Sequence, residues 1–274
     1  MRNAARSWCA PPNRESDALS AGSERVSTPG AGSERVSTPG ASSERVSTPG
    51  ASSERVSTPG RKSPSWQGQL SSPTRFILLR HGQTALSVDR RYSGRGNPEL
   101  TLEGRRQARA AAQRVMREKD ISAIVTSPLS RARATAEEVA AVTGVDIVEH
   151  PGLIENDFGE WEGLTFVEAA ERHPEIHRKW LSDITVPAPG GESFAQVAER
   201  VSETKDDLLQ RYPGQTIVLV SHVTPIKLML REALGVGPEL LFRLHLDLAS
   251  VSIAEFFPDG GSVVRLVNDA AHCH

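Results

Sequence analysis

The chain has 274 residues, with 32 Lys and Arg against 34 Asp and Glu, a formal net charge of −2 and 38% hydrophobic residues. This balance excludes a generally basic nucleic-acid-binding protein, and no apolar run approaches the length that crosses a membrane. The 2 cysteines, Cys9 and Cys273, stand at opposite ends, which excludes a disulfide framework and a four-cysteine zinc site. We therefore expect neither a nucleic acid nor a membrane as partner.

The first part of the chain is of low complexity. Residues 21–60 are four copies of a ten-residue unit, AGSERVSTPG twice and then ASSERVSTPG twice. Each unit offers only Ala and Val as apolar residues and ends in Pro-Gly, which breaks helices and central strands. We expect residues 1–74 to be a disordered tail, because they bury too little apolar surface to offset the entropy of ordering.

The charge of the chain divides near the same place. Residues 1–75 contain 10 Lys and Arg and 6 Asp and Glu, whereas residues 76–274 contain 22 and 28. The near-neutral total is therefore the sum of a basic tail and an acidic domain. Residues 1–20 contain no apolar core of the kind that directs secretion, which predicts a cytoplasmic protein.

Strand-like and helix-like segments alternate through residues 75–274, which we expect to form one domain. Strands are predicted near 75–80, 122–126, 146–149, 216–221, 251–257 and 263–267, and helices near 102–119, 129–142, 166–182, 193–212 and 224–234. Alternation of this kind predicts an α/β fold, a three-layer sandwich with a mainly parallel central sheet.

Histidines follow two of the predicted strands directly. Arg80-His81 ends the strand at 75–80, and His222 follows the strand at 216–221. Because the carboxyl ends of parallel strands meet at one edge of a sheet, both imidazoles should lie within reach of one ligand.

A third strand end carries arginine. Arg131 follows the strand at 122–126 at the start of a helix, where a cation opposes the helix dipole. A bound anion would remove that conflict. Together with Arg80, His81 and His222, Arg131 predicts a pocket for a dianion, since guanidinium groups hold phosphate oxygens in pairs.

Four segments of the chain resemble those of a known family. LLRHGQT, TSPLSRARATAE, LIENDFGEWEGLT and VLVSHVTPIK are similar, in order, to the signature segments of the histidine phosphatase superfamily, also called phosphoglycerate mutase-like. The resemblance covers residues 75–274 and looks closest to the acid-phosphatase domain that some actinobacterial proteins carry behind a ribonuclease H domain. Here the repeat tail stands in place of that domain, so the resemblance extends to the phosphatase and not to the nuclease.

The resemblance implies roles for the residues at the strand ends. His81 would be the nucleophile and form a phosphohistidine intermediate, which requires a neutral attacking nitrogen. Arg80, Arg131 and His222 would hold the non-bridging oxygens and stabilise the charge of the transition state.

Glu155 matches the family's general acid and base, which protonates the leaving oxygen and then activates water. Spacing alone does not distinguish Glu155 from three nearby carboxylates, Asp157, Glu160 and Glu162. The choice of Glu155 therefore rests on the resemblance.

Three further positions lie where the family often contacts substrate phosphate, namely Thr84, Ser93 and Gly94. One position departs from the pattern, since Ser87 stands where many members carry Asn. A Ser hydroxyl replaces one hydrogen bond of an amide but not its donor-and-acceptor pair.

Weaker signals complete the set. Thr224 and Pro225 are typical of the N-cap and first residue of a helix, which would leave backbone amides for an anion. His173 and His177 have a spacing that binds zinc on a helix, but we interpret them as a surface pair. Arg133 is expected to be a surface helix residue.

These residues predict a metal-independent phosphomonoester hydrolase of the acid-phosphatase type, with a small-molecule phosphomonoester as substrate and no cofactor. A metal is disfavoured because Arg80 and Arg131 would repel a cation. Two alternatives are a phosphoglycerate-mutase-type phosphoryl transfer and a non-catalytic phosphate-binding module. The sequence leaves open the physiological substrate, the role of the repeats and the oligomeric state, for which a dimer is one option.

Overall fold

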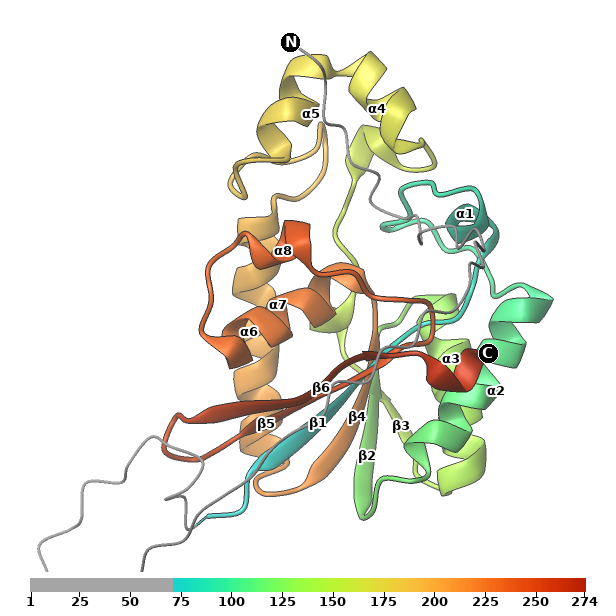
Figure 1. Cartoon of the computed structure of the whole chain (residues 1–274), viewed down its shortest axis with the longest axis vertical. Coiled ribbons are helices and arrows are strands. Elements are labelled where there is room, and N and C mark those ends of the chain that lie inside the picture. Colours follow the sequence, from blue (N-terminus) through green and yellow to red (C-terminus); the bar gives the residue numbers. More distant parts are fainter. Residues whose placement is uncertain (1–70) are drawn as a thin grey trace, which may run out of the picture. The chain divides into compact units, whose positions relative to one another are not determined.

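The computed structural model of the chain describes residues 71–274, and the repeats of the expected tail lie outside this range. The domain is built on one sheet (Figure 1). Its six strands are β1 (Thr74–Arg80), β2 (Ile121–Thr126), β3 (Ile147–Glu149), β4 (Thr216–Ser221), β5 (Val251–Phe256) and β6 (Ser262–Asp269).

The strands follow the order β3-β2-β4-β1-β5-β6 across the sheet. The pairs β3-β2, β2-β4 and β4-β1 are parallel, whereas β5 is antiparallel to β1 and β6 is antiparallel to β5. The prediction of a mainly parallel sheet is confirmed, and the last two strands form an antiparallel edge. In the central pair, Arg80 lies opposite Ser221, so β1 and β4 end at the same level.

Eight α-helices connect or cover the strands within the described range. They are α1 (Ala85–Val88), α2 (Leu102–Val115), α3 (Ser130–Thr143), α4 (Phe166–Arg172), α5 (Pro174–Trp180), α6 (Phe194–Arg211), α7 (Val223–Leu234) and α8 (Leu240–Arg243). Three short 3-10 helices are η1 (Pro151–Leu153), η2 (Gly159–Trp161) and η3 (Ala271–Cys273). None of the helices between residues 71 and 274 is both long enough and apolar enough to span a membrane.

The sheet lies between two helical layers, as predicted. Side chains alternate along β1, so that Ile77 and Leu79 pack against α2 and α3, while Phe76 and Leu78 pack toward α6 and α7. All four are fully buried, which accounts for the unbroken apolar run of this strand.

The start of α7 differs from the prediction. Its N-cap is His222, with φ −127° and ψ 179°, and the helix begins at Val223 rather than after Thr224. The chain therefore passes from β4 into α7 through one extended residue. Pro225 falls in the first helical turn, where the N–H that it lacks would have no intrahelical partner.

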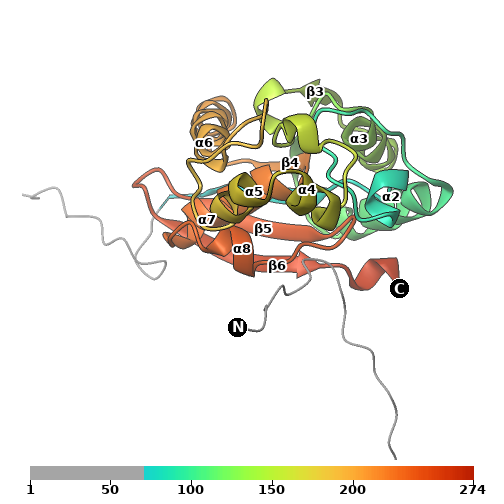
Figure 2. The same cartoon turned by 90° about the horizontal axis from the view of Figure 1, so that it is seen from above.

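The helices α4 and α5 lie beyond the carboxyl ends of the parallel strands (Figures 1 and 2). The segment that carries them runs from Phe166 to Trp180, between η2 and α6. This placement covers the edge of the sheet at which the predicted site residues emerge.

Candidate active site

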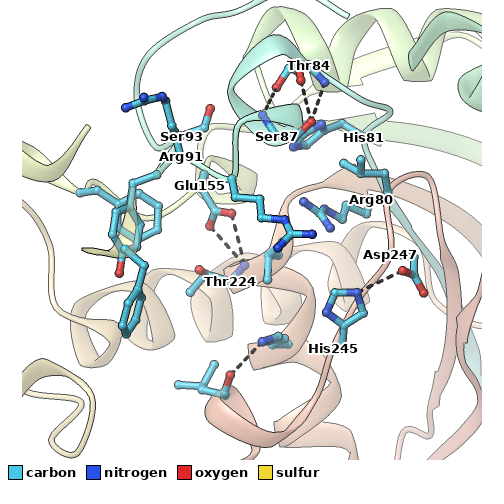
Figure 3. Close-up of a pocket in the computed structure, with 18 of the residues that line it drawn as sticks. Arg80, His81, Thr84, Ser87, Arg91, Ser93, Glu155, Thr224, His245 and Asp247 are labelled. Carbon is cyan, nitrogen blue, oxygen red and sulfur yellow. Dashed lines mark hydrogen bonds and ion pairs between the residues drawn. The ribbon is translucent and has the colours of Figure 1, made fainter. Parts of the chain in front are cut away.

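A cavity of about 360 Å³ lies at the carboxyl ends of β1 and β4 (Figure 3). Five of the predicted site residues line it, namely Arg80, His81, Thr84, Ser93 and Glu155. Arg131 and His222 are fully buried beside it. The structure thus brings together residues from five separate segments of the chain.

His81 is the first residue after β1 and is held on both sides by backbone bonds. Its N–H donates to the carbonyl of Ser221 over 3.1 Å, and its carbonyl accepts from the N–H of Ala249 over 3.1 Å. The ring nitrogen Nδ1 lies 2.7 Å from the carbonyl oxygen of Gly82. A carbonyl only accepts, so Nδ1 carries the proton and Nε2 keeps its lone pair.

The environment of His81 opposes protonation of the ring. Burial is the largest cause, followed by the charges of Arg131 and Arg80, and together they lower the pKa of His81 well below its ordinary value of 6.5. The imidazole is therefore neutral at physiological pH, which is the state that a nucleophile needs.

His222 lies next to His81, with ring centroids 5.1 Å apart. Its Nε2 is 2.8 Å from the hydroxyl oxygen of Ser127, the residue that follows β2. Burial and then the charge of Arg131 lower the pKa of His222 well below 6.5. Its Nδ1 is buried and has no hydrogen-bond partner within the described chain.

The guanidinium of Arg131 lies in the first turn of α3 and is held by a loop. It donates to the carbonyls of Gly96 over 2.8 Å, Gly94 over 2.9 Å and Ser93 over 3.2 Å. Burial lowers its pKa to about 10, so the group stays charged at neutral pH. The carbonyl dipoles compensate the unfavourable position of a cation at a helix start.

The same loop is held from the other side by Glu162. Its carboxylate accepts the N–H of Gly94 over 2.8 Å and that of Gly96 over 3.2 Å. Glu162 therefore fixes the backbone that presents carbonyls to Arg131, whereas Gly94 itself does not line the cavity.

Glu155 stands in the loop after η1, with 5% of its surface exposed. Its Oε1 accepts the N–H of Asn156 over 2.8 Å and the N–H of Thr224 over 3.2 Å. The sequence predicted that the backbone amides near Thr224 would be available to a bound anion. In the structure the amide of Thr224 instead donates to the carboxylate of Glu155 (Figure 3). Arg200 donates to the carbonyls of Ile154 and Glu155 and fixes this loop.

Thr84 and Ser87 form the capping box of α1. The N–H of Ser87 donates to the Thr84 hydroxyl over 3.3 Å, and the N–H of Thr84 donates to the Ser87 hydroxyl over 2.9 Å. Ser87 also donates its hydroxyl proton to the carbonyl of Thr84 over 2.7 Å. Ser87, which stands where many members of the family carry Asn, therefore caps α1 at the edge of the cavity.

Sequence reasoning gave no individual role to most residues in the rest of the cavity. Its other lining residues include Arg90, Arg91, Tyr92, Phe158, Phe166, Trp180, Phe194, Lys227, Leu241, His245 and Asp247. One signal was available, because Lys227 is a single cation within the apolar first half of α7. The aromatic residues come from loops and helix ends whose convergence no local pattern indicates.

The prediction for His173 and His177 is wrong for the second residue. His177 is 2% exposed, and its Nε2 lies 3.1 Å from the hydroxyl of Tyr92. Nδ1 of His173 accepts the indole N–H of Trp161 over 3.0 Å, so both histidines belong to an aromatic cluster. Between residues 71 and 274, no group of three or more His, Cys, Asp or Glu side chains is arranged to hold a metal.

Arg133 lies away from the site, as predicted. Its side chain is 56% exposed and pairs with Glu137 and Glu149 on the protein surface.

The chain is similar in sequence to known proteins. The chain is 56% identical over 210 residues to "Bifunctional protein Rv2228c" of Mycobacterium tuberculosis, covering 77% of this chain and 58% of that protein. It is 34% identical to "Phosphoserine phosphatase 1" of Hydrogenobacter thermophilus, covering 72% and 93%. The chain thus spans less than two thirds of the first of these relatives.

A solved structure shares the fold. Mycobacterial glucosyl-3-phosphoglycerate phosphatase in complex with VO3 superposes with a TM-score of 0.66 at 28% identity, covering 71% of this chain and 99% of that one. Residues 76–269 match the histidine phosphatase superfamily (branch 1), a range that contains every residue of the site. The chain is a member of the histidine phosphatase superfamily.

Proposed function

We propose that the domain is a metal-independent phosphomonoester hydrolase that works through a phosphohistidine on His81. The observation that carries the proposal is the state of this imidazole, which is neutral and has its proton fixed on Nδ1 by the carbonyl of Gly82. A histidine that only bound phosphate by electrostatic attraction would bind it more tightly in the protonated, positively charged state.

In the first step, Nε2 of His81 attacks phosphorus, and the bond from phosphorus to the leaving oxygen breaks. Arg80 and Arg131 supply the positive charge for the non-bridging oxygens beside the buried ring of His81. The neighbouring His222 donates a hydrogen bond to the same oxygens through the ring nitrogen that lacks a partner.

Glu155 gives its proton to the leaving oxygen. Its Oε1 accepts from two backbone amides over 2.8 and 3.2 Å, whereas Oε2 has only a longer bond of 3.4 Å from Thr224, so the transferable proton belongs on Oε2. In the second step the same carboxylate takes a proton from water, the water oxygen bonds to phosphorus, and the bond to Nε2 of His81 breaks. Phosphate then leaves, and both residues return to their starting states.

Hydrolysis of 4-nitrophenyl phosphate tests this proposal. We expect activity that persists in the presence of a chelator, falls by at least about 1,000-fold in His81→Ala, and falls strongly in Glu155→Gln. The exposed His274→Ala variant is the matched control and should retain full activity. Wild-type enzyme denatured with detergent at alkaline pH should carry phosphate in an alkali-stable, acid-labile bond that His81→Ala lacks.

Three results would overturn the proposal. The first is unchanged activity in His81→Ala. The second is conversion of 3-phosphoglycerate to 2-phosphoglycerate faster than its hydrolysis, which would identify a mutase. The third is phosphate binding without labelling or turnover, which would instead support a binding module.

A further inference from the structure

The cavity is much larger than a phosphate group requires, and its far side is aromatic. Beyond the phosphate-holding residues it is lined by five rings, those of Tyr92, Phe158, Phe166, Trp180 and Phe194, here called the aromatic wall. The rings pack on one another, with centroids 4.8 Å apart for Tyr92 and Phe158 and 4.7 Å apart for Trp180 and Phe194.

The polar end of Tyr92 is already engaged. Its hydroxyl lies 3.1 Å from Nε2 of His177, and burial raises the pKa of the phenol above its ordinary value. The hydroxyl is therefore occupied within the protein, and the wall as a whole presents mainly apolar surface to the cavity.

The opposite side of the cavity is polar. Nε2 of His245 lies 3.0 Å from Oδ1 of Asp247 (Figure 3). Oδ2 of Asp247 accepts the side-chain amide N–H of Asn268 over 2.8 Å. A carboxylate only accepts, so His245 carries its proton on Nε2. The other apolar residues that line the cavity, Val223, Leu241 and Leu248, are aliphatic, so an aromatic group that enters it contacts phenyl and indole rings only at the aromatic wall.

Two of the cations near the wall already have partners. Arg91 pairs with Glu168 over 2.8 Å, and Lys227 donates to the carbonyl of Leu241 over 2.8 Å. Neither group needs an anionic part of the substrate to satisfy it. The part of the leaving group that meets the aromatic wall is therefore defined by its apolar surface, whereas Arg90, which also lines the cavity, has no ion pair within residues 71–274.

We propose that the cavity selects phosphomonoesters of an alcohol that carries an aromatic ring, with the ring packed on the aromatic wall and the phosphate at His81. This inference rests on the proposed function, since it names the substrate class of the same site. Ring-on-ring packing and exclusion of water from apolar surface supply the preference.

Matched alkyl esters test the proposal without altering the reacting bond. 2-Phenylethyl phosphate and ethyl phosphate are both esters of primary alcohols and differ in the ring. We expect kcat/KM for the phenylethyl ester to exceed that for ethyl phosphate by at least about tenfold. O-Phosphoserine, which adds charges instead of a ring, should show no such gain. Equal values for the two alkyl esters, or a preference for O-phosphoserine, would overturn the proposal.

Variants locate the preference on the wall. Phe166 is half-buried, so Phe166→Ala should fold, and it should lower the ratio of the two kcat/KM values several-fold. Phe257→Ala, at the end of β5 far from the cavity, is the matched control and should leave the ratio unchanged. A ratio unaltered in Phe166→Ala and in a second wall variant, Phe194→Leu, would contradict the assignment to this wall.

A binding measurement separates this inference from the proposed function. Calorimetry with 2-phenylethylphosphonate and ethylphosphonate, which cannot be hydrolysed, should give at least about tenfold tighter binding for the first. This preference is expected in His81→Ala as well. Ring-selective binding without any turnover would therefore refute the proposed hydrolysis but support the preference of the cavity for aromatic groups. His81-dependent turnover without ring selectivity would support hydrolysis and refute that preference.

Discussion

The hydroxyl of Ser127 bonds to Nε2 of His222 across two neighbouring strand ends, over 2.8 Å. The ring of His222 is neutral and carries one proton. If Ser127 donates to Nε2, that proton stays on Nδ1, the nitrogen that lacks a partner. Ser127 would in this way orient the hydrogen-bond donor that we propose for phosphate, although it does not line the cavity itself.

Ser127→Ala should lower kcat about tenfold, the cost of about one hydrogen bond in the transition state. Without the hydroxyl, His222 is free to carry its proton on either nitrogen. Steady-state kinetics with 4-nitrophenyl phosphate check this, with Ser130→Ala as the control, because its hydroxyl makes only long bonds of 3.4 Å to backbone carbonyls. A normal kcat in Ser127→Ala would show that the tautomer of His222 is fixed by other means.

Glu162→Gln should weaken phosphate binding. An amide oxygen can accept from Gly94 or Gly96, but its NH2 group cannot accept from the other, so the loop loses one of its two bonds. Arg131, held by the carbonyls of that loop, then loses its fixed position.

We expect the inhibition constant of inorganic phosphate for Glu162→Gln to rise by about tenfold. The matched control is Glu160→Gln, because Glu160 is 62% exposed and its ion pair is with His173 alone. Equal inhibition constants for the two variants would show that Glu162 does not position Arg131 for phosphate binding.

The backbone of the site was readable from the sequence because it lies on strand ends. The strand at 216–221 was predicted with its observed bounds, and the strand at 75–80 begins one residue earlier, at Thr74. Apolar runs of this length, each followed by a polar residue, fix both the strand and the edge at which His81 and His222 emerge.

The supports of the site could not be predicted in this way. Glu162 binds the amide of Gly94 across 68 positions of sequence, and neither residue type signals the contact. His177 was predicted to form a surface pair with His173, yet the centroid of its ring lies 4.4 Å from that of Phe166. Such contacts depend on how loops fold over the sheet, which local periodicity does not encode.

The kcat/KM of the enzyme should not fall as the pH is lowered through 6.5, the range in which an ordinary histidine takes up a proton. Since burial, Arg131 and Arg80 lower the pKa of His81, the proposed nucleophile stays neutral well below pH 6.5. We expect kcat/KM for 4-nitrophenyl phosphate to show no one-proton loss near pH 6.5 as the pH is lowered. A loss centred there, in a buffer series of constant ionic strength, would mean that His81 is more exposed to water than its 5% accessibility indicates.

The stability of the domain should depend on pH through the same buried rings. The pKa of His222 is depressed in the folded state, so above pH 6.5 the ring is neutral both folded and unfolded and contributes no pH dependence. Below pH 6.5 the unfolded chain binds a proton that the folded chain excludes, and the free energy of unfolding falls by about 1.4 kcal/mol per pH unit for this one group. The loss ends once the pH has fallen through the pKa of the folded state.

Urea unfolding of wild type and His222→Gln at several pH values between about 8 and about 5 tests this expectation. Below pH 6.5 the free energy of unfolding should depend less steeply on pH in the variant than in wild type. The exposed His274→Gln is the control and should retain the wild-type slope. Parallel curves for wild type and His222→Gln would show that the ring takes up its proton as readily in the folded protein as in the unfolded chain.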